Sequence, residues 1–140
     1  MRHLGKQNPR FRFFLNPYSD VRFTSCPQCG NKMRQRKLPL VIHVAPDALF
    51  ALNKTCKYCP TCDLLLAHQD EIEWLLAQAA VDRGRNAPSA DEYLIVGTMD
   101  RPDWKAGMQN ALPLSHLLDH VHDFREVVTF TLDYGWRPET

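Results

Sequence analysis

The sequence predicts an α+β fold built around a metal-binding ribbon. Two cysteine turns, Cys26-Pro27-Gln28-Cys29 and Cys59-Pro60-Thr61-Cys62, are separated by the 29 residues of segment 30–58. Residues 10–25 alternate apolar and polar side chains as in a β-hairpin, and residues 70–83 carry apolar side chains at helical spacing. We therefore expect a zinc ribbon with an N-terminal β-hairpin, one central helix and a strand–helix–helix–strand C-terminal unit, packed as one composite domain.

Each cysteine turn places two thiolates close together. Proline fixes one backbone angle of the turn, and a turn-favouring residue, Gly30 or Asp63, follows the second cysteine. Four thiolates from two such turns make a closed tetrahedral zinc site, which is structural rather than catalytic because no coordination position is open. The predicted ligands of one structural Zn²⁺ are therefore Cys26, Cys29, Cys59 and Cys62.

The fifth cysteine, Cys56, allows a second interpretation, because Cys56-Lys57-Tyr58-Cys59 has the same spacing. This segment lacks the proline of the other two turns, so we expect Cys56 to be a buried free thiol. Two alternatives stay open. One is an iron–sulfur cluster that uses three cysteines at this spacing plus one more, and the other is a coincidence of two cysteine pairs that bind no metal.

Positive charge is concentrated in the first 40 residues. They hold nine of the 17 Lys and Arg residues against one acid, Asp20, which gives 9 − 1 = +8 and leaves 8 − 15 = −7 for the rest of the chain. Clustered positive charge binds phosphate. The candidate nucleic-acid contacts are Arg10, Arg12, Arg22, Lys32, Arg34, Arg36 and Lys37. The alternative is that this basic part neutralises the acidic remainder within the molecule.

The remaining elements follow from local patterns. Segment 32–44 is an expected strand, in which Pro39 indicates an edge position or an interruption. Segment 48–57 returns to the second cysteine turn, 64–67 is a short buried strand, and the helix over 70–83 ends at Gly84. A linker at 82–90 separates residues 1–82 from the unit 91–140. That unit contains strand 92–99, a short helix from Asp100, a helix over 113–121 and strand 126–134.

A histidine cluster on the predicted helix 113–121 suggests a second metal site. His116 and His120 stand four residues apart, with His122 close behind. The spacing resembles part of a metalloprotease motif, but Leu117 occupies the position of the catalytic Glu and no third ligand is evident. The alternative is histidines exposed on a helix surface beside Asp119 and Asp123. Because no other catalytic motif is present, we expect a non-enzymatic protein.

Composition and targeting signals give the compartment. The chain of 140 residues is 44% hydrophobic, the size and content of one globular domain. The basic start is followed only by the short apolar run Phe13-Phe14-Leu15, and no apolar run approaches the ~18 residues of a membrane helix. We expect a cytoplasmic protein.

The run CPQCGNKMRQRKLPLVIHV, together with TCKYCPTCDLLLAHQDEIEWLL, resembles a family of uncharacterised bacterial zinc-ribbon proteins over most of the chain. This resemblance implies the fold and the zinc site. A looser resemblance joins the two cysteine turns and the acidic helix after them to the zinc-binding half of MqsA-type antitoxins. No DNA-reading helix-turn-helix follows that helix here.

These observations favour a non-enzymatic zinc-binding protein whose basic N-terminal third binds nucleic acid. The expected partner is RNA or a ribonucleoprotein such as the ribosome, contacted through phosphates without sequence readout. The alternative is a protein–protein interaction module, antitoxin-like or a subunit of a larger assembly, in which the acidic C-terminal half contacts the partner.

Overall fold

A computed structural model describes residues 5–18, 21, 23–45, 48–82, 84, 86, 88–89, 92–110 and 118–129, without the side chains of 107–110. Within these ranges the protein is a mixed α+β structure dominated by strands. The elements are β1 (Arg12–Asn16), β2 (Arg34–Val44), β3 (Ala48–Cys59), β4 (Leu64–His68), α1 (Gln69–Asp82), β5 (Tyr93–Met99), α2 (Arg101–Asn110), β6 (Val121–Asp123) and β7 (Glu126–Val128).

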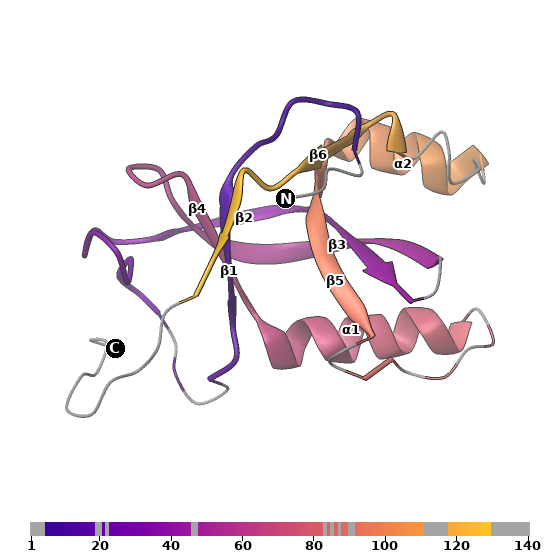
Figure 1. The fold of residues 1–140 in the computed structure, drawn as a ribbon, viewed down its shortest axis with the longest axis horizontal. Coiled ribbons are helices and arrows are strands. Elements are labelled where there is room, and N and C mark those ends of the chain that lie inside the picture. The colour runs from indigo at the N-terminus through magenta and orange to yellow at the C-terminus, as the bar shows by residue number, and fades with distance from the viewer. Residues whose placement is uncertain are drawn as a thin grey trace.

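The strands form one seven-stranded sheet in the order β6-β5-β2-β3-β4-β1-β7. β1 runs parallel to β4 and β7, and the other pairs are antiparallel. β6 and β7 lie at opposite ends of this order, yet only Phe124 and Arg125 separate them in the chain. The sheet therefore curls until segment 121–128, called the strap below, joins its two edges (Figure 1).

The main hydrophobic core lies between the curled sheet and α1. α1 contributes Ile72, Leu76 and Ala80, which repeat at helical spacing on its buried side. The strap adds Phe124, whose ring stacks on Phe13 with centroids 4.5 Å apart. Each fully buried Phe or Leu stabilises the fold by roughly 1.5–3 kcal/mol.

Two smaller clusters flank this core. Phe14, Phe23, Met33, Leu64 and Leu66 pack beside the cysteine turns. Val41, Leu49, Met99 and Val121 pack beneath Trp104 of α2. The two helices thus lie on different sides of the sheet, and the cysteine turns lie at the end away from α2 (Figure 1).

The predicted N-terminal hairpin is wrong. β1 pairs in parallel with β4 and β7 rather than with the residues that follow it. Of the described residues between 21 and 25, only Ser25 forms a β-bridge, and its partner is Lys32. The reason is that Phe13 and Phe14 are both buried, on opposite faces of β1, so the strand needs neighbours that cover both faces.

Pro39 was expected at an edge position or an interruption of the strand, and it does lie just before one of the two ladders of β2 begins. Pro39 is paired with Asn53 of β3, but the ladder between β2 and β5 begins only at Leu40. A missing N–H group is tolerated where a ladder ends. Segment 34–39 is consequently paired on one side only among the described residues.

The C-terminal elements agree with expectation in part. β5 and the start of α2 are confirmed, and β7 is the beginning of the predicted strand 126–134, whose residues 130–134 lie outside the described ranges. Residues 113–117 of the predicted helix 113–121 also lie outside them. The predicted end of that helix at Val121 is wrong, because Val121 is the first residue of strand β6. β6 approaches β5 so closely that a methyl group at Gly97 would overlap the carbonyl of His122.

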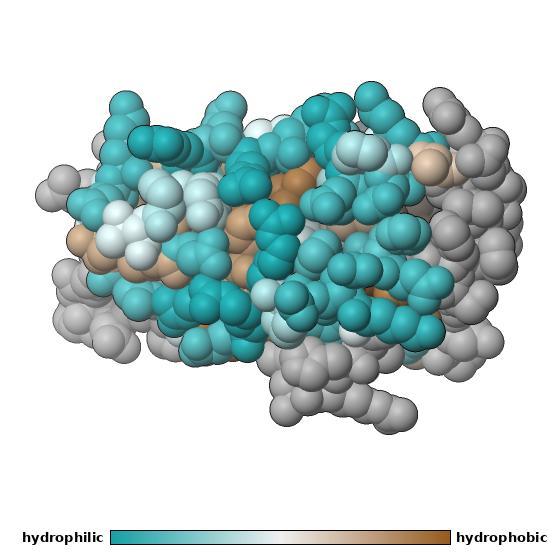
Figure 2. All heavy atoms as spheres, turned by 90° about the horizontal axis from the view of Figure 1, so that it is seen from above, coloured by the Kyte–Doolittle hydropathy of each residue, from teal (hydrophilic) through white to brown (hydrophobic). Residues whose placement is uncertain are grey.

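Hydrophilic side chains cover most of the face that carries α2, with a few hydrophobic ones between them (Figure 2). Among the described residues, no helix has the length and apolar content needed to cross a bilayer.

Candidate metal centre and the cationic strip beside it

The four cysteines are positioned by two turns at one end of the sheet. Cys26 and Cys29 lie on the segment between β1 and β2, Cys59 is the last residue of β3, and Cys62 lies in the turn before β4. In the first turn, the Gly30 amide donates to the Cys26 carbonyl at 2.9 Å. Gly30 and Asp63, which follow the second cysteines, have φ of 80° and 54°. Both turns therefore leave the cysteines through a left-handed residue.

The four sulfurs converge on one point. All Sγ atoms lie within 4.8 Å of one another, with Cys29 and Cys59 3.5 Å apart and Cys26 and Cys62 4.0 Å apart. These separations are far longer than the ~2.05 Å of a disulfide bond. A tetrahedron with metal–sulfur distances of about 2.3 Å has edges of about 3.8 Å, so the cluster fits a single tetrahedral ion. The four cysteines could thus hold a metal ion.

The thiols differ in their environment. Cys26 and Cys59 are buried, Cys62 is half-buried and Cys29 is exposed. Burial raises the pKa of Cys26, although the Gln28 amide donates to its sulfur at 3.4 Å. The backbone of Asn31 lowers the pKa of Cys29 to about 7, chiefly by a hydrogen bond to its sulfur. Cys29 therefore ionises more easily than Cys26. Full coordination of a metal must displace the proton from thiols such as Cys26, so metal uptake depends on pH.

Asp63 connects the second turn to the strap. Its carboxylate accepts hydrogen bonds from the Tyr58 hydroxyl at 2.9 Å and from the Arg125 guanidinium at 2.7 Å. Its carbonyl accepts from the Arg12 amide at 2.8 Å. One residue therefore ties the cysteine turn to β3, β1 and the strap.

Cys56 lies apart from the four-cysteine group. It is 2% exposed, packs in the main core and directs its thiol to the Lys54 carbonyl at 3.7 Å. Burial raises its pKa to about 12. Since Cys56 and Cys59 are three residues apart on β3, their side chains project to opposite faces of the sheet.

The candidate nucleic-acid contacts fall into two sets. Arg10 pairs with Asp100 at 3.2 Å, and Arg12 pairs with Glu126 at 3.3 Å and with Gln28 at 2.6 Å. Arg22 lies outside the described residues. The other four are exposed and form no ion pair with a carboxylate in the described part of the chain; we call them the cationic strip: Lys32, Arg34, Arg36 and Lys37. The strip follows the first cysteine turn and the singly paired part of β2.

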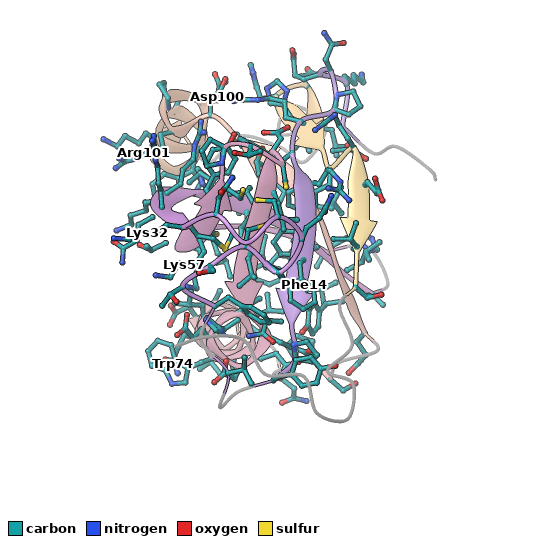
Figure 3. The ribbon with its side chains drawn as sticks, turned by 90° about the vertical axis from the view of Figure 1, so that its left-hand side faces the viewer. Phe14, Lys32, Lys57, Trp74, Asp100 and Arg101 are labelled. Carbon is teal, nitrogen blue, oxygen red and sulfur yellow. The ribbon has the colours of Figure 1, made fainter. Side chains whose placement is uncertain are left out.

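Two more cations extend this surface and were missed by the sequence analysis. Lys57 on β3 lies opposite Gln35, and Arg101 begins α2. Figure 3 shows Lys32, Lys57 and Arg101 along one side of the molecule, with the exposed Trp74 of α1 further along it. The sequence offered a signal for Lys57. Pairing the expected strand 32–44 with the returning segment 48–57 places Lys57 opposite Gln35, beside the basic run.

The histidine cluster is described only in part. His120 Nδ1 lies 3.5 Å from Asp103, while His122 Nδ1 donates a hydrogen bond to the Asn8 carbonyl at 2.8 Å. His116 is outside the described residues. In the part of the chain that is described, the cysteine group is the one grouping of three or more metal-binding side chains.

Comparisons with protein-family models, with curated proteins and with solved structures give no significant match. The two resemblances drawn from the cysteine motifs therefore stay predictions.

Proposed function

We propose that this chain is a non-enzymatic zinc-binding protein whose cationic strip binds nucleic acid, with RNA or a ribonucleoprotein such as the ribosome as the partner. The observation that carries the proposal is the exposure of the four strip cations without carboxylate partners in the described residues. Cations that are already paired, such as Arg10 and Arg12, have less to gain from a phosphate. Exposed cations without carboxylate partners supply sequence-independent affinity for a phosphate backbone.

Zinc is the metal that best suits four thiolates at tetrahedral spacing. A single bound iron would share this geometry, whereas a multi-iron cluster divides the four thiolates among two or four irons and spreads them further apart. With four protein ligands the ion has no position for substrate, so its role is structural. It ties the loop before β2 to the turn after β3 and thereby fixes the direction of the cationic strip.

Metal analysis of the purified protein tests the first half of the proposal. We expect one zinc per chain and a colourless protein, and we expect Co²⁺ substitution to give the visible bands of tetrahedral thiolate coordination. A coloured protein that contains iron would overturn the assignment. A chain purified under non-denaturing conditions with no metal would do so as well.

Salt-dependent binding tests the second half. Each phosphate contact with a single strand contributes about −0.7 to the slope of log affinity against log salt. Replacing Lys32 and Arg34 by Gln should therefore reduce the slope for single-stranded RNA by about 1.4. The matched control replaces Lys6 and Arg125, two exposed cations that are already paired with Asp119 and Asp63, by Gln and should leave the slope nearly unchanged. Equal slopes for the two double variants, or affinity independent of salt, would contradict the proposal.

A second candidate is a protein-interaction module. The observation that favours it is the outward face of α1, where Trp74 and Val81 are each 64% exposed and stand two helical turns apart. Affinity purification from native lysate with and without nuclease separates the two classes. A partner lost with nuclease supports nucleic-acid binding, and a partner retained after nuclease but lost on Trp74→Ala supports the module.

A further inference from the structure

A small recess lies at the far end of the cationic strip, next to the start of α2. It has a volume of about 190 Å³. Three parts of the chain line it: the entry to β1, the first half of β2, and the junction of β5 with α2. The pairing of β2 with β5 brings the last two together. Pockets for drug-sized ligands measure about 300–1,000 Å³, so this recess suits one small chemical group.

The recess carries excess positive charge. Its lining includes four cations, Arg10, Arg36, Lys37 and Arg101, and one acid, Asp100. Asp100 is already engaged, since one carboxylate oxygen lies 3.2 Å from Arg10 and the other 3.9 Å from His122 Nε2. Three of the cations therefore have no carboxylate partner among the described residues. The amino end of α2 adds a partial positive charge beside them.

Two of these cations are held in place before any ligand arrives. The guanidinium groups of Arg10 and Arg36 lie 4.8 Å and 5.0 Å from the ring centroid of Phe11, and Arg36 also lies 5.1 Å from the Tyr58 ring. Phe11 is 3% exposed and has a φ of 66°, a left-handed conformation that costs an ordinary residue about 1–2 kcal/mol. Its carbonyl accepts a hydrogen bond from the Arg125 amide at 2.8 Å, which helps to keep that conformation.

Guanidinium groups stacked on a ring lose little further freedom when they bind an anion. A guanidinium group presents its N–H groups in a planar fork that matches two oxygens of a phosphate. The buried Phe11 ring is covered by the arginines and cannot stack on a base. The chemistry of the recess is therefore recognition of an oxyanion rather than of a nucleobase.

We propose that this recess binds the terminal phosphate of a nucleic-acid strand. A phosphate monoester carries a charge of about −1.5 to −2 at pH 7 and continues into the chain through one ester bond. An internal phosphodiester carries one negative charge and continues in both directions, so it suits a small cationic recess less well. This inference rests on the proposed function and names the part of the partner that the far end of the strip would hold.

The test uses the full chain and three oligonucleotides of one sequence, bearing a 5′-phosphate, a 3′-phosphate or hydroxyl groups at both ends. Fluorescence anisotropy at one salt concentration should show about tenfold tighter binding of one phosphorylated form, the gain from one added charge-assisted contact. Arg101→Ala should abolish this preference, and Arg36→Lys should reduce it because lysine cannot form the planar fork. Circular dichroism melting checks that both variants fold.

The matched control is Lys32→Ala, at the other end of the strip. It should weaken binding of all three oligonucleotides by the same factor and leave the preference intact. Equal affinity of the wild-type chain for the three forms would overturn the recess while leaving the proposed function in place. Failure of all three forms to bind at low salt would overturn the proposed function and this inference with it.

Discussion

Asp63 joins the metal centre to the strap, so its replacement tests how these two parts of the fold support each other. The residue has a φ of 54°, and its carboxylate accepts hydrogen bonds from Tyr58 and Arg125. Three substitutions separate the contributions. Asp63→Asn keeps the size and the tolerance for left-handed backbone, Asp63→Gly removes the carboxylate but also tolerates that backbone, and Asp63→Ala removes the carboxylate and adds backbone strain.

The expected losses of unfolding free energy follow from these contacts. The hydrogen bond from the part-buried Tyr58 hydroxyl to a charged acceptor is worth about 1.5–3 kcal/mol. The pair between Arg125 and Asp63 has side chains 49% and 38% exposed, so it contributes only about 0–1 kcal/mol. A left-handed Ala adds about 1 kcal/mol of strain. We expect losses of about 3 kcal/mol for Ala, about 2 for Gly and about 1 for Asn.

Urea unfolding at fixed zinc concentration measures these values. Competition with a chelator on the same variants measures zinc affinity, which should fall in the same order because the ion binds only the folded turn. The reasoning is refuted if Gly destabilises more than Ala, since the backbone would then not be strained. A loss below ~0.5 kcal/mol for Ala would also refute it, because surface positions without such contacts show changes of that size.

Three further predictions concern other parts of the fold. Cys59→Ser should abolish stoichiometric zinc binding, whereas Cys56→Ser should retain one zinc per chain, as measured by metal analysis; loss of zinc in both variants would make Cys56 a ligand. Gly97→Ala should cost more than ~3 kcal/mol in urea unfolding, because the new methyl overlaps the His122 carbonyl and β6 must move; a change below ~1 kcal/mol would contradict this contact. The pKa of Tyr93 is raised by burial and by its hydrogen bond to Glu73 at 2.7 Å, so the folded state holds this proton more tightly. The resulting stability is present below the ordinary value of about 10 and is lost as pH rises above it, so Tyr93→Phe should flatten the fall in urea midpoint between pH 9 and 11.

Local patterns in the sequence predict the local structure well. The apolar spacing of Ile72, Leu76 and Ala80 indicates α1, and the acids at its first turn mark its start. The turn-favouring Gly30 and Asp63 after each cysteine pair correspond to the two left-handed residues. These features depend on neighbours within a few residues, which is the range over which a single sequence carries information.

The pairing of distant segments could not be predicted in this way. β1 joins β4, about 50 residues later in the chain, and the apolar run Phe13-Phe14-Leu15 was the one sign that both faces of β1 are covered. The strap contains two strands of three residues each, too short for alternation to be recognised. The recess could not be predicted from the sequence for the same reason, because only the pairing of β2 with β5 brings Arg36 and Arg101 together.

Under the proposed function, the position of each cation relative to the metal centre bears on its availability to a phosphate. A zinc ion held by four thiolates leaves a net charge of about −2, which neighbouring cations help to balance. Lys32 forms a β-bridge with Ser25, next to Cys26, so its backbone lies beside the cysteine group. Arg36 and Lys37 pair with Cys56 and Thr55, three and four residues before Cys59, which places them about 10–13 Å from it along the strand. The proposed contact with a terminal phosphate therefore lies at the end of the strip whose backbone is farther from the cysteine group.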